Sequence, residues 1–297
     1  MIIDIHTHAF PQSIRTERAR FFTGEPAFRL LYESPKALLV GAADIVAMMD
    51  EQGVDKSVIF GFPWQNIETC RINNDYIIEA VGRYPERLIG FCCVDPLHPE
   101  AAAEVERCLQ AGLQGVGELA FYTSGIDSRC LASLDPIMAL ARRFDCPVML
   151  HTNEPVGHQY PGKSPNTLMQ IYSLAQRFAA NRLILAHWGG GIFFYALLKK
   201  EVRETLANIW FDTAASPYLY QPEIYAQALI LAGEDKILFG SDFPLLKPKR
   251  YFKDLEQTGL SRGQKAAVCG LNAAKVLKIG EARCPEETQR QECRSGS

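Results

Sequence analysis

The chain has no excess of positive charge. Its 31 lysines and arginines face 34 aspartates and glutamates, which gives a formal net charge of −3 at pH 7. Nucleic acids and anionic membrane surfaces attract proteins through clustered basic side chains. We therefore expect a small-molecule substrate as the partner, with no nucleic-acid or membrane partner, and leave a homodimer open.

Long apolar runs are also missing. No stretch of about 18 apolar residues, the length that a membrane-spanning helix needs, is present. The first residues show neither the basic segment nor the cleavage site of a secretory signal. The chain therefore predicts a cytoplasmic location.

Cysteine patterns typical of disulfide frameworks or structural zinc sites are absent. The nine cysteines are an odd number without CxxC spacing. Six lie in or beside apolar runs and are expected to be reduced thiols of the core: Cys70, Cys92, Cys93, Cys108, Cys130 and Cys146. Residues 281–297 are polar and free of aromatics, which predicts a disordered tail with Cys284 and Cys293 exposed.

The most informative feature that is present is the N-terminal stretch MIIDIHTH, a short apolar run that ends in His-Thr-His. Successive side chains of a strand point to opposite faces. His6 and His8 would therefore point the same way, about 6.6 Å apart along the strand, with Thr7 facing away. Two neighbouring imidazoles suit one metal ion, and a chance pair on a surface strand is the alternative.

Three more apolar runs each stop at a candidate metal ligand. The run in PVMLHTNE stops at His151, the run in RLILAHWGGG at His187, and the run in KILFGSDFP at Asp242. Each is typical of a strand buried on both faces. Any one of these side chains alone could be an ordinary buried polar residue. Together with the His-Thr-His triplet they favour a catalytic site for zinc, manganese or iron.

Strand-like and helical segments alternate along the chain. Eight strands are predicted, at residues 2–5, 56–62, 88–94, 113–119, 147–150, 183–186, 209–212 and 237–239. Amphipathic stretches predict helices at residues 43–52, 73–83, 99–111, 133–144, 166–179, 192–206, 221–232, 251–258 and 264–277. This alternation predicts an α/β fold, a single (β/α)8 TIM barrel over residues 1–280. A doubly wound sheet is disfavoured, because HTHAFP is no glycine-rich phosphate loop.

In such a barrel the candidate ligands follow strands one, five, six and eight, at the face where barrel enzymes carry out their chemistry. The order HxH, His, His, Asp resembles the amidohydrolase superfamily. More narrowly, DIHTH, AHWGGG, FGSDFP and GLNAAKVL resemble the amidohydrolase-2 branch, over residues 1 to about 279. That branch contains aminocarboxymuconate-semialdehyde-type and aromatic-acid decarboxylases, lactonases and a hydratase.

The resemblance implies one divalent metal, with zinc expected before manganese or iron. The implied ligands are His6, His8, His151 and Asp242. A metal ion lowers the pKa of a bound water toward neutrality. Asp242 would then be the general base, and His187 would act beside the metal, polarising a carbonyl or moving a proton.

Glu118, in GVGELAF at the end of the fourth strand, leaves the metal count open. A carboxylate there resembles the bridging ligand of two-metal members such as the TatD-type nucleases, so a second metal is one reading. The other is a buried carboxylate paired with a cation or a histidine N–H. We favour one metal, because no lysine ends the strand and the wider motifs resemble the mononuclear branch.

Substrate contacts are expected from the loops after the strands. The loop over residues 9–42 carries four arginines that could each bind a carboxylate bidentately: Arg15, Arg18, Arg20 and Arg29. The loop after the fifth strand could cover the site with Glu154, His158, Tyr160 and Lys163. Trp64 and Trp188 are expected to form aromatic walls.

Three functions fit this residue set. The main prediction is a metal-dependent hydrolase that uses an activated water on a small carboxylated or cyclic ester, amide or lactone. The alternative is a non-oxidative, metal-dependent decarboxylase of an aromatic or muconate-like acid. A two-metal, TatD-like phosphodiesterase fits less well, because the acidic balance offers no phosphate-binding surface. The ligand set alone does not separate hydrolysis from decarboxylation.

Overall fold

The computed structural model describes residues 1–280. It contains eight strands that pair in chain order, each parallel to the next. The strands are β1 (Ile3–His8), β2 (Lys56–Phe60), β3 (Leu88–Cys92), β4 (Gly115–Leu119), β5 (Val148–Leu150), β6 (Leu183–Leu185), β7 (Ile209–Asp212) and β8 (Ile237–Leu238). Every predicted strand is therefore confirmed.

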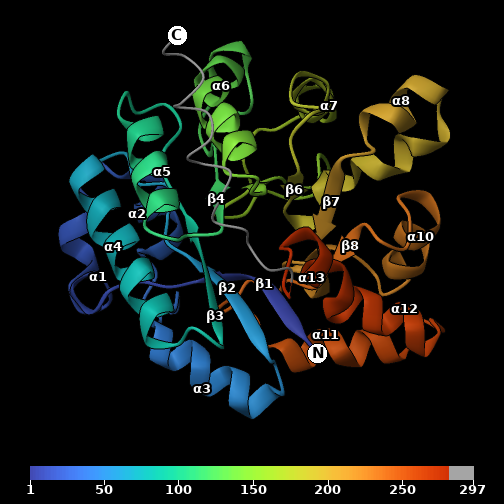
Figure 1. Ribbon diagram of the computed structural model, residues 1–297, viewed down its shortest axis with the longest axis horizontal. Coiled ribbons are helices and arrows are strands. Elements are labelled where there is room, and N and C mark those ends of the chain that lie inside the picture. The colour runs from blue at the N-terminus through green and yellow to red at the C-terminus, as the bar shows by residue number, and fades with distance from the viewer. Residues whose placement is uncertain (281–297) are drawn as a thin grey trace, which may run out of the picture.

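The first and last strands meet, which closes the sheet on itself. The Ile5 N–H donates to the Phe239 carbonyl, and the Asp242 N–H donates to the His6 carbonyl, each at 2.9 Å. Figure 1 shows the strands in the middle of the molecule with helices around them. The predicted (β/α)8 barrel is confirmed, and its closure sets β1 beside the segment after β8.

The outer layer consists of helices that follow the strands. These are α3 (Ala42–Gln52), α4 (Ile67–Arg83), α5 (Ala101–Gln110), α6 (Ser128–Arg143), α7 (Leu168–Arg177), α8 (Lys200–Thr205), α9 (Ser216–Leu219), α10 (Ile224–Leu231) and α11 (Pro248–Glu256). The described chain ends with α12 (Arg262–Ala266), a π-helical turn η3 (Ala267–Leu271) and α13 (Asn272–Val276).

Helix caps explain why α4 and α6 begin earlier than the amphipathic pattern predicts. The Asn66 side chain accepts from the Thr69 N–H at 2.9 Å, and the Asp127 side chain accepts from the Cys130 N–H at 2.8 Å. Such caps satisfy N–H groups that the first turn of a helix leaves free. Apolar periodicity finds the buried face of a helix but does not locate its cap.

Two local predictions are wrong. Residues 9–42 are not a plain loop, because they contain α1 (Gln12–Thr16), the 3-10 helix η1 (Arg18–Phe21) and α2 (Pro26–Tyr32). The helix expected over 192–206 is replaced by the irregular 3-10 segment η2 (His187–Leu197) and the short α8. Tertiary packing holds these short elements, and periodicity over a window does not detect them.

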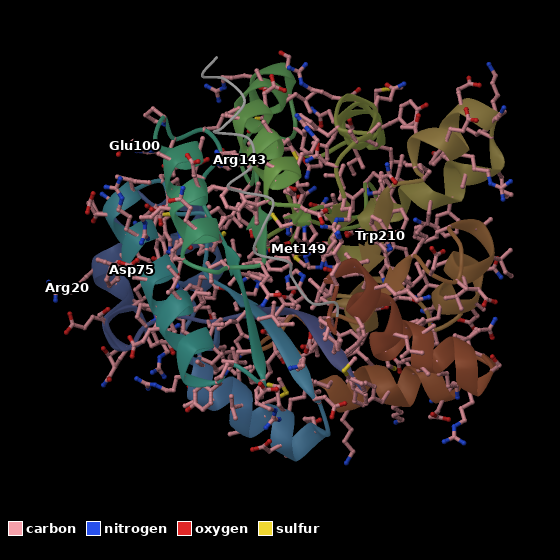
Figure 2. The ribbon with its side chains drawn as sticks, viewed as in Figure 1. Arg20, Asp75, Glu100, Arg143, Met149 and Trp210 are labelled. Atoms are coloured by element: carbon pink, nitrogen blue, oxygen red, sulfur yellow. The ribbon has the colours of Figure 1, made fainter. Side chains whose placement is uncertain are left out.

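The core has one layer inside the barrel and one between strands and helices. Met149 of β5 is fully buried in the inner layer, and Figure 2 labels it near the middle of the molecule, whereas Arg20 lies at the edge. The six predicted core cysteines are confirmed as buried free thiols. The single-domain organisation stays a prediction, and the expected tail over 281–297, with Cys284 and Cys293, lies outside the described residues.

Within residues 1–280, no helix combines the length and the apolar character needed to cross a bilayer.

Candidate metal centre

Five of the predicted catalytic and metal-ligand residues line one cavity at the carboxyl ends of the strands. They are His8, Glu118, His151, His187 and Asp242. The cavity has a volume of about 1330 Å³. Residues from both ends of the chain thus meet in one place, as the barrel prediction requires.

His6, His8 and Asp242 converge on one point. The Asp242 Oδ1 atom lies 3.6 Å from His6 Nε2 and 3.3 Å from His8 Nε2. The Nε2 atom of His6 is buried and has no hydrogen-bond partner in the described part of the chain. Two imidazole nitrogens and a carboxylate oxygen form a donor set for zinc or manganese. A bound cation would satisfy this otherwise unpaired nitrogen.

Hydrogen bonds at the far side of each ring decide which nitrogen faces the cavity. Because a carboxylate only accepts, His6 donates its Nδ1–H to Asp212 Oδ2 at 2.8 Å. His8 donates its Nδ1–H to the Gly61 carbonyl at 3.2 Å. Each ring therefore keeps the lone pair of Nε2 for a metal, the arrangement that outer hydrogen bonds impose on ligating histidines.

Asp212 is a site residue that the sequence analysis missed. Besides holding His6, its Oδ1 atom accepts from the backbone N–H groups of His187 at 2.8 Å and Ala214 at 3.0 Å. The pattern that marked the other sites was present, because the seventh predicted strand also ends on an acidic residue. Its partner His6 is far away in sequence, so only the fold shows the contact.

Glu118 lies between two groups of histidines. Its Oε2 atom is 3.7 Å from His6 Nε2 and 3.9 Å from His8 Nε2. Its Oε1 atom is 2.9 Å from His151 Nδ1 and 3.5 Å from His187 Nε2. Burial would raise the pKa of Glu118, but the imidazoles of His6 and His151 outweigh burial and hold that pKa well below its usual range. Glu118 is therefore a buried anion with one oxygen directed at each group.

His151 is not in the same group as the other three implied ligands. Its Nε2 atom lies 2.8 Å from the Gly162 carbonyl oxygen and its Nδ1 atom 2.9 Å from Glu118 Oε1, so hydrogen bonds engage both ring nitrogens. The residues that could share one ion with it are Glu118 and His187. The structure thus brings His6, His8 and Asp242 together and sets His151 on the other side of Glu118.

A left-handed turn positions His187. Five consecutive residues, His187 to Gly191, have φ between 54° and 83°. Glycine is required within this turn, because a Cβ on Gly190 would lie 2.5 Å from the Asn153 carbonyl oxygen. His187 donates its Nδ1–H to the Ala214 carbonyl at 3.1 Å, which leaves Nε2 directed at Glu118.

The loop after β5 meets the cavity with three of its four predicted residues. Glu154, His158 and Tyr160 line the cavity. Lys163 is fastened within the loop, because its ammonium group donates to Glu154 Oε1 at 2.7 Å and to the Val156 carbonyl at 2.6 Å. Lys163 therefore holds the loop together and neutralises Glu154.

The two tryptophans expected as cavity walls lie in the core instead. Trp64 is 1% exposed and donates its indole N–H to Asn73 Oδ1 at 3.0 Å. Trp188 is fully buried and donates to Ser216 Oγ at 2.9 Å. Neither lines the cavity. Trp64 follows β2 and Trp188 follows His187 after β6, but each ring packs in the core between barrel and helices.

The four arginines of residues 9–42 do not reach the cavity either. Arg15 donates to Asp44 at 3.1 Å and Arg29 to Glu33 at 2.8 Å, Arg20 pairs with Glu17, and Arg18 donates to the Ala37 carbonyl at 2.7 Å. Arg15 thus links α1 to α3 and Arg18 links η1 to the segment after α2, whereas Arg20 and Arg29 pair locally. The expectation that one of them receives a substrate carboxylate has no support in the structure.

A parallel eight-stranded barrel with HxH on β1, histidines after β5 and β6 and an aspartate after β8 defines a protein of the amidohydrolase fold. The model of the amidohydrolase family Amidohydro_2 matches residues 3–279. The chain belongs to this family, as its motifs predict.

Curated relatives are decarboxylases. Gamma-resorcylate decarboxylase of Polaromonas sp. is 23% identical over 286 residues, which cover 79% of this chain and 86% of that protein. The 2-amino-3-carboxymuconate-6-semialdehyde decarboxylase of Dictyostelium discoideum is 25% identical over 268 residues, covering 74% and 72%.

Solved structures share the fold. A dihydroxybenzoic acid decarboxylase from Polaromonas sp., with bound manganese and the inhibitor 2-nitroresorcinol, superposes with a TM-score of 0.67. It is 18% identical, and the match covers 95% of this chain and 98% of that one.

Proposed function

We propose that this protein is a metal-dependent decarboxylase of an aromatic acid. The observation that carries the proposal is the convergence of His6 Nε2, His8 Nε2 and Asp242 Oδ1, because His8 and Asp242 line the cavity and His6 Nε2 faces Asp242 directly behind them. The decarboxylase relatives, one with bound manganese, support this reaction over the hydrolysis that the sequence analysis put first.

A divalent cation fits the donor set, and His6, His8 and Asp242 would hold it. We propose manganese or zinc. When bound, the cation supplies positive charge that binds and orients an acidic group of the substrate. Asp212 and Gly61 hold the two imidazoles in the required orientation.

Loss of carbon dioxide leaves an electron pair on the ring carbon, which must take up a proton. We propose that His187 delivers it. His187 Nδ1–H is engaged by the Ala214 carbonyl, so Nε2 is the nitrogen that can hold and release a proton into the cavity. The left-handed turn keeps the ring in place during this transfer.

Hydrolysis is the second candidate, and Glu118 is the observation that favours it. Its two oxygens face different groups, His6 with His8 and His151 with His187. A carboxylate shared in this way could bridge two cations, and paired cations stabilise both the attacking and the leaving oxygen of a displacement. Asp242 would then be the general base on an ester or lactone.

Metal content and product analysis on the same preparation separate the candidates. We expect about one manganese or zinc ion per chain by mass spectrometry, carbon dioxide from a panel of hydroxybenzoates, and no turnover of lactones or esters. Glu118→Gln should leave the ion count unchanged. Two ions per chain, falling to one in Glu118→Gln, together with lactone turnover, would replace decarboxylation by hydrolysis. No ion after reconstitution would contradict both.

A further inference from the structure

Exposed apolar side chains gather around the opening of the cavity. Eight of the fourteen large apolar residues that are strongly exposed within residues 1–280 line this cavity. Six of these eight define what we call the apolar mouth: Leu38, Phe194, Leu197, Leu198, Tyr218 and Leu245. Their exposed fractions run from 45% to 77%. A concentration of exposed apolar surface on one site marks a place where a ligand or partner binds.

The apolar mouth comes from four separate segments. Leu38 follows α2, Phe194 and the two leucines belong to η2 and its end, Tyr218 lies in α9, and Leu245 follows β8. They surround the same cavity that reaches His8, His187 and Asp242. A molecule bound at the metal-ligand residues therefore extends into the mouth if it is long enough.

The cavity offers few positive charges above its histidines. Lys36 is the one lysine or arginine among the lining residues of the described chain, and it is exposed to solvent. Lys163 is held by Glu154, and the arginines of residues 9–42 have partners elsewhere. A second carboxylate on a substrate would lose water without gaining an ion pair inside the cavity, which is unfavourable.

The volume of the cavity also indicates a substrate larger than a simple benzoate. At about 1330 Å³ the cavity exceeds the range of roughly 300–1,000 Å³ that is usual for small-molecule sites. One benzoate ring at the metal-ligand residues leaves the apolar mouth unfilled.

We propose that the substrate is an aromatic monocarboxylic acid with a long apolar substituent, such as an alkyl chain, which lies in the apolar mouth. The inference about the reacting end of this substrate depends on the proposed decarboxylase function. The inference about the substituent depends only on the apolar mouth, because burying each methylene there tightens binding roughly threefold to fourfold.

Calorimetry on the metal-loaded full chain tests this proposal with a series of ligands of increasing chain length, which we call the ladder. The probes are 2-hydroxybenzoate, its 6-butyl and 6-octyl derivatives, and 4-hydroxyisophthalate as the dicarboxylate. We expect Kd to fall at least tenfold from the unsubstituted acid to the octyl acid, and the dicarboxylate to bind no better than the unsubstituted acid. Equal Kd values along the ladder, or tighter binding of the dicarboxylate, would overturn the proposal.

A matched pair of variants assigns the effect to the mouth. Leu198 is 59% exposed and lines the cavity, whereas Leu30 is 58% exposed and does not. Leu198→Asp should remove most of the gain from the octyl chain, and Leu30→Asp should keep it. Leu245→Asp, on another segment of the mouth, provides an independent repeat if Leu198→Asp does not fold.

Two further readouts keep the outcomes distinct. Carbon dioxide release is measured on the same ladder, so tight octyl binding without release would contradict decarboxylation but not the apolar ligand. Sedimentation of the same variants reports the oligomeric state. If Leu198→Asp turns a dimer into a monomer and leaves the ladder unchanged, a second copy covers the mouth and the proposal is wrong.

Discussion

At the scale of single residues, Asp212 orients the proposed metal site without being one of its ligands. One oxygen accepts from His6 Nδ1 and the other from two backbone N–H groups, including that of His187. The same carboxylate therefore sets the proton position on His6 and the path of the chain at His187. Its side chain is fully buried, so no water replaces these bonds.

Asp212→Asn should weaken metal binding while the protein stays folded. The amide oxygen can still accept the two backbone bonds, but the NH₂ group donates to His6 Nδ1 and so forces the ring proton onto Nε2. We expect a 10- to 100-fold loss of metal affinity, the usual cost of changing such an outer hydrogen bond. Titration with manganese measures it. The exposed Asp235→Asn is the control, and unchanged affinity in Asp212→Asn would contradict the assigned proton position.

At the scale of elements, a buried carboxylate ties α5 to α4. Glu104 of α5 is 2% exposed and accepts from Asn74 of α4 at 2.9 Å and from Arg107 at 2.8 Å. Burial would raise the pKa of Glu104, but these hydrogen bonds outweigh burial and lower it below its ordinary value. Ionised Glu104 therefore stabilises the packing of the two helices.

Glu104→Gln should lower the free energy of unfolding at pH 7 by about 1–3 kcal/mol, because Arg107 loses the buried one of its two charged partners and keeps only Asp75. A lowered pKa in the folded state means that the stabilisation is present above the ordinary glutamate pKa and is lost as the pH falls through the folded value. Urea unfolding between pH 7 and pH 3 should therefore show a shallower decline for the variant. Glu106→Gln, which removes a surface pair with Arg143, serves as the control and should follow the unmodified protein.

At the scale of the whole molecule, the proposed ion would link the first strand of the barrel to the segment after its last strand. His6 and His8 belong to β1, and Asp242 follows β8, the last strand. These strands already share backbone bonds where the barrel closes. A cation held between them would add its binding free energy to the stability of the closed barrel.

Removing the metal should therefore lower the Tm. A free ion at 100 times its Kd stabilises a folded protein by about 2.7 kcal/mol. We expect thermal unfolding several degrees lower after chelation and full recovery on addition of manganese. His6→Ala should show no response to chelator, whereas His98→Ala, outside the cavity lining, should respond as the unmodified protein does. An unchanged Tm after verified metal removal would contradict a cation that links β1 to the segment after β8.

The residue types of the site and their place in the barrel could be predicted, whereas their partners could not. His6, His8, His187, Glu118 and Asp242 were found because each ends or follows a buried strand, and the ends of parallel strands meet. The split of His151 from His6 and His8 depends on which ring nitrogen the Gly162 carbonyl engages. That choice depends on side-chain orientation, which the spacing of residues along the sequence does not indicate.

Local sequence is sufficient for the barrel because strands buried on both faces, alternating with amphipathic helices, leave few other ways to bury their apolar residues. It is insufficient for contacts between elements, which depend on register and packing. Trp64 and Trp188 follow strands β2 and β6 but turn into the core, and Arg15 and Arg29 pair with Asp44 and Glu33 rather than reaching the cavity. Tertiary structure likewise creates the apolar mouth. Its residues come from four segments, and only the closed barrel brings these segments around one opening.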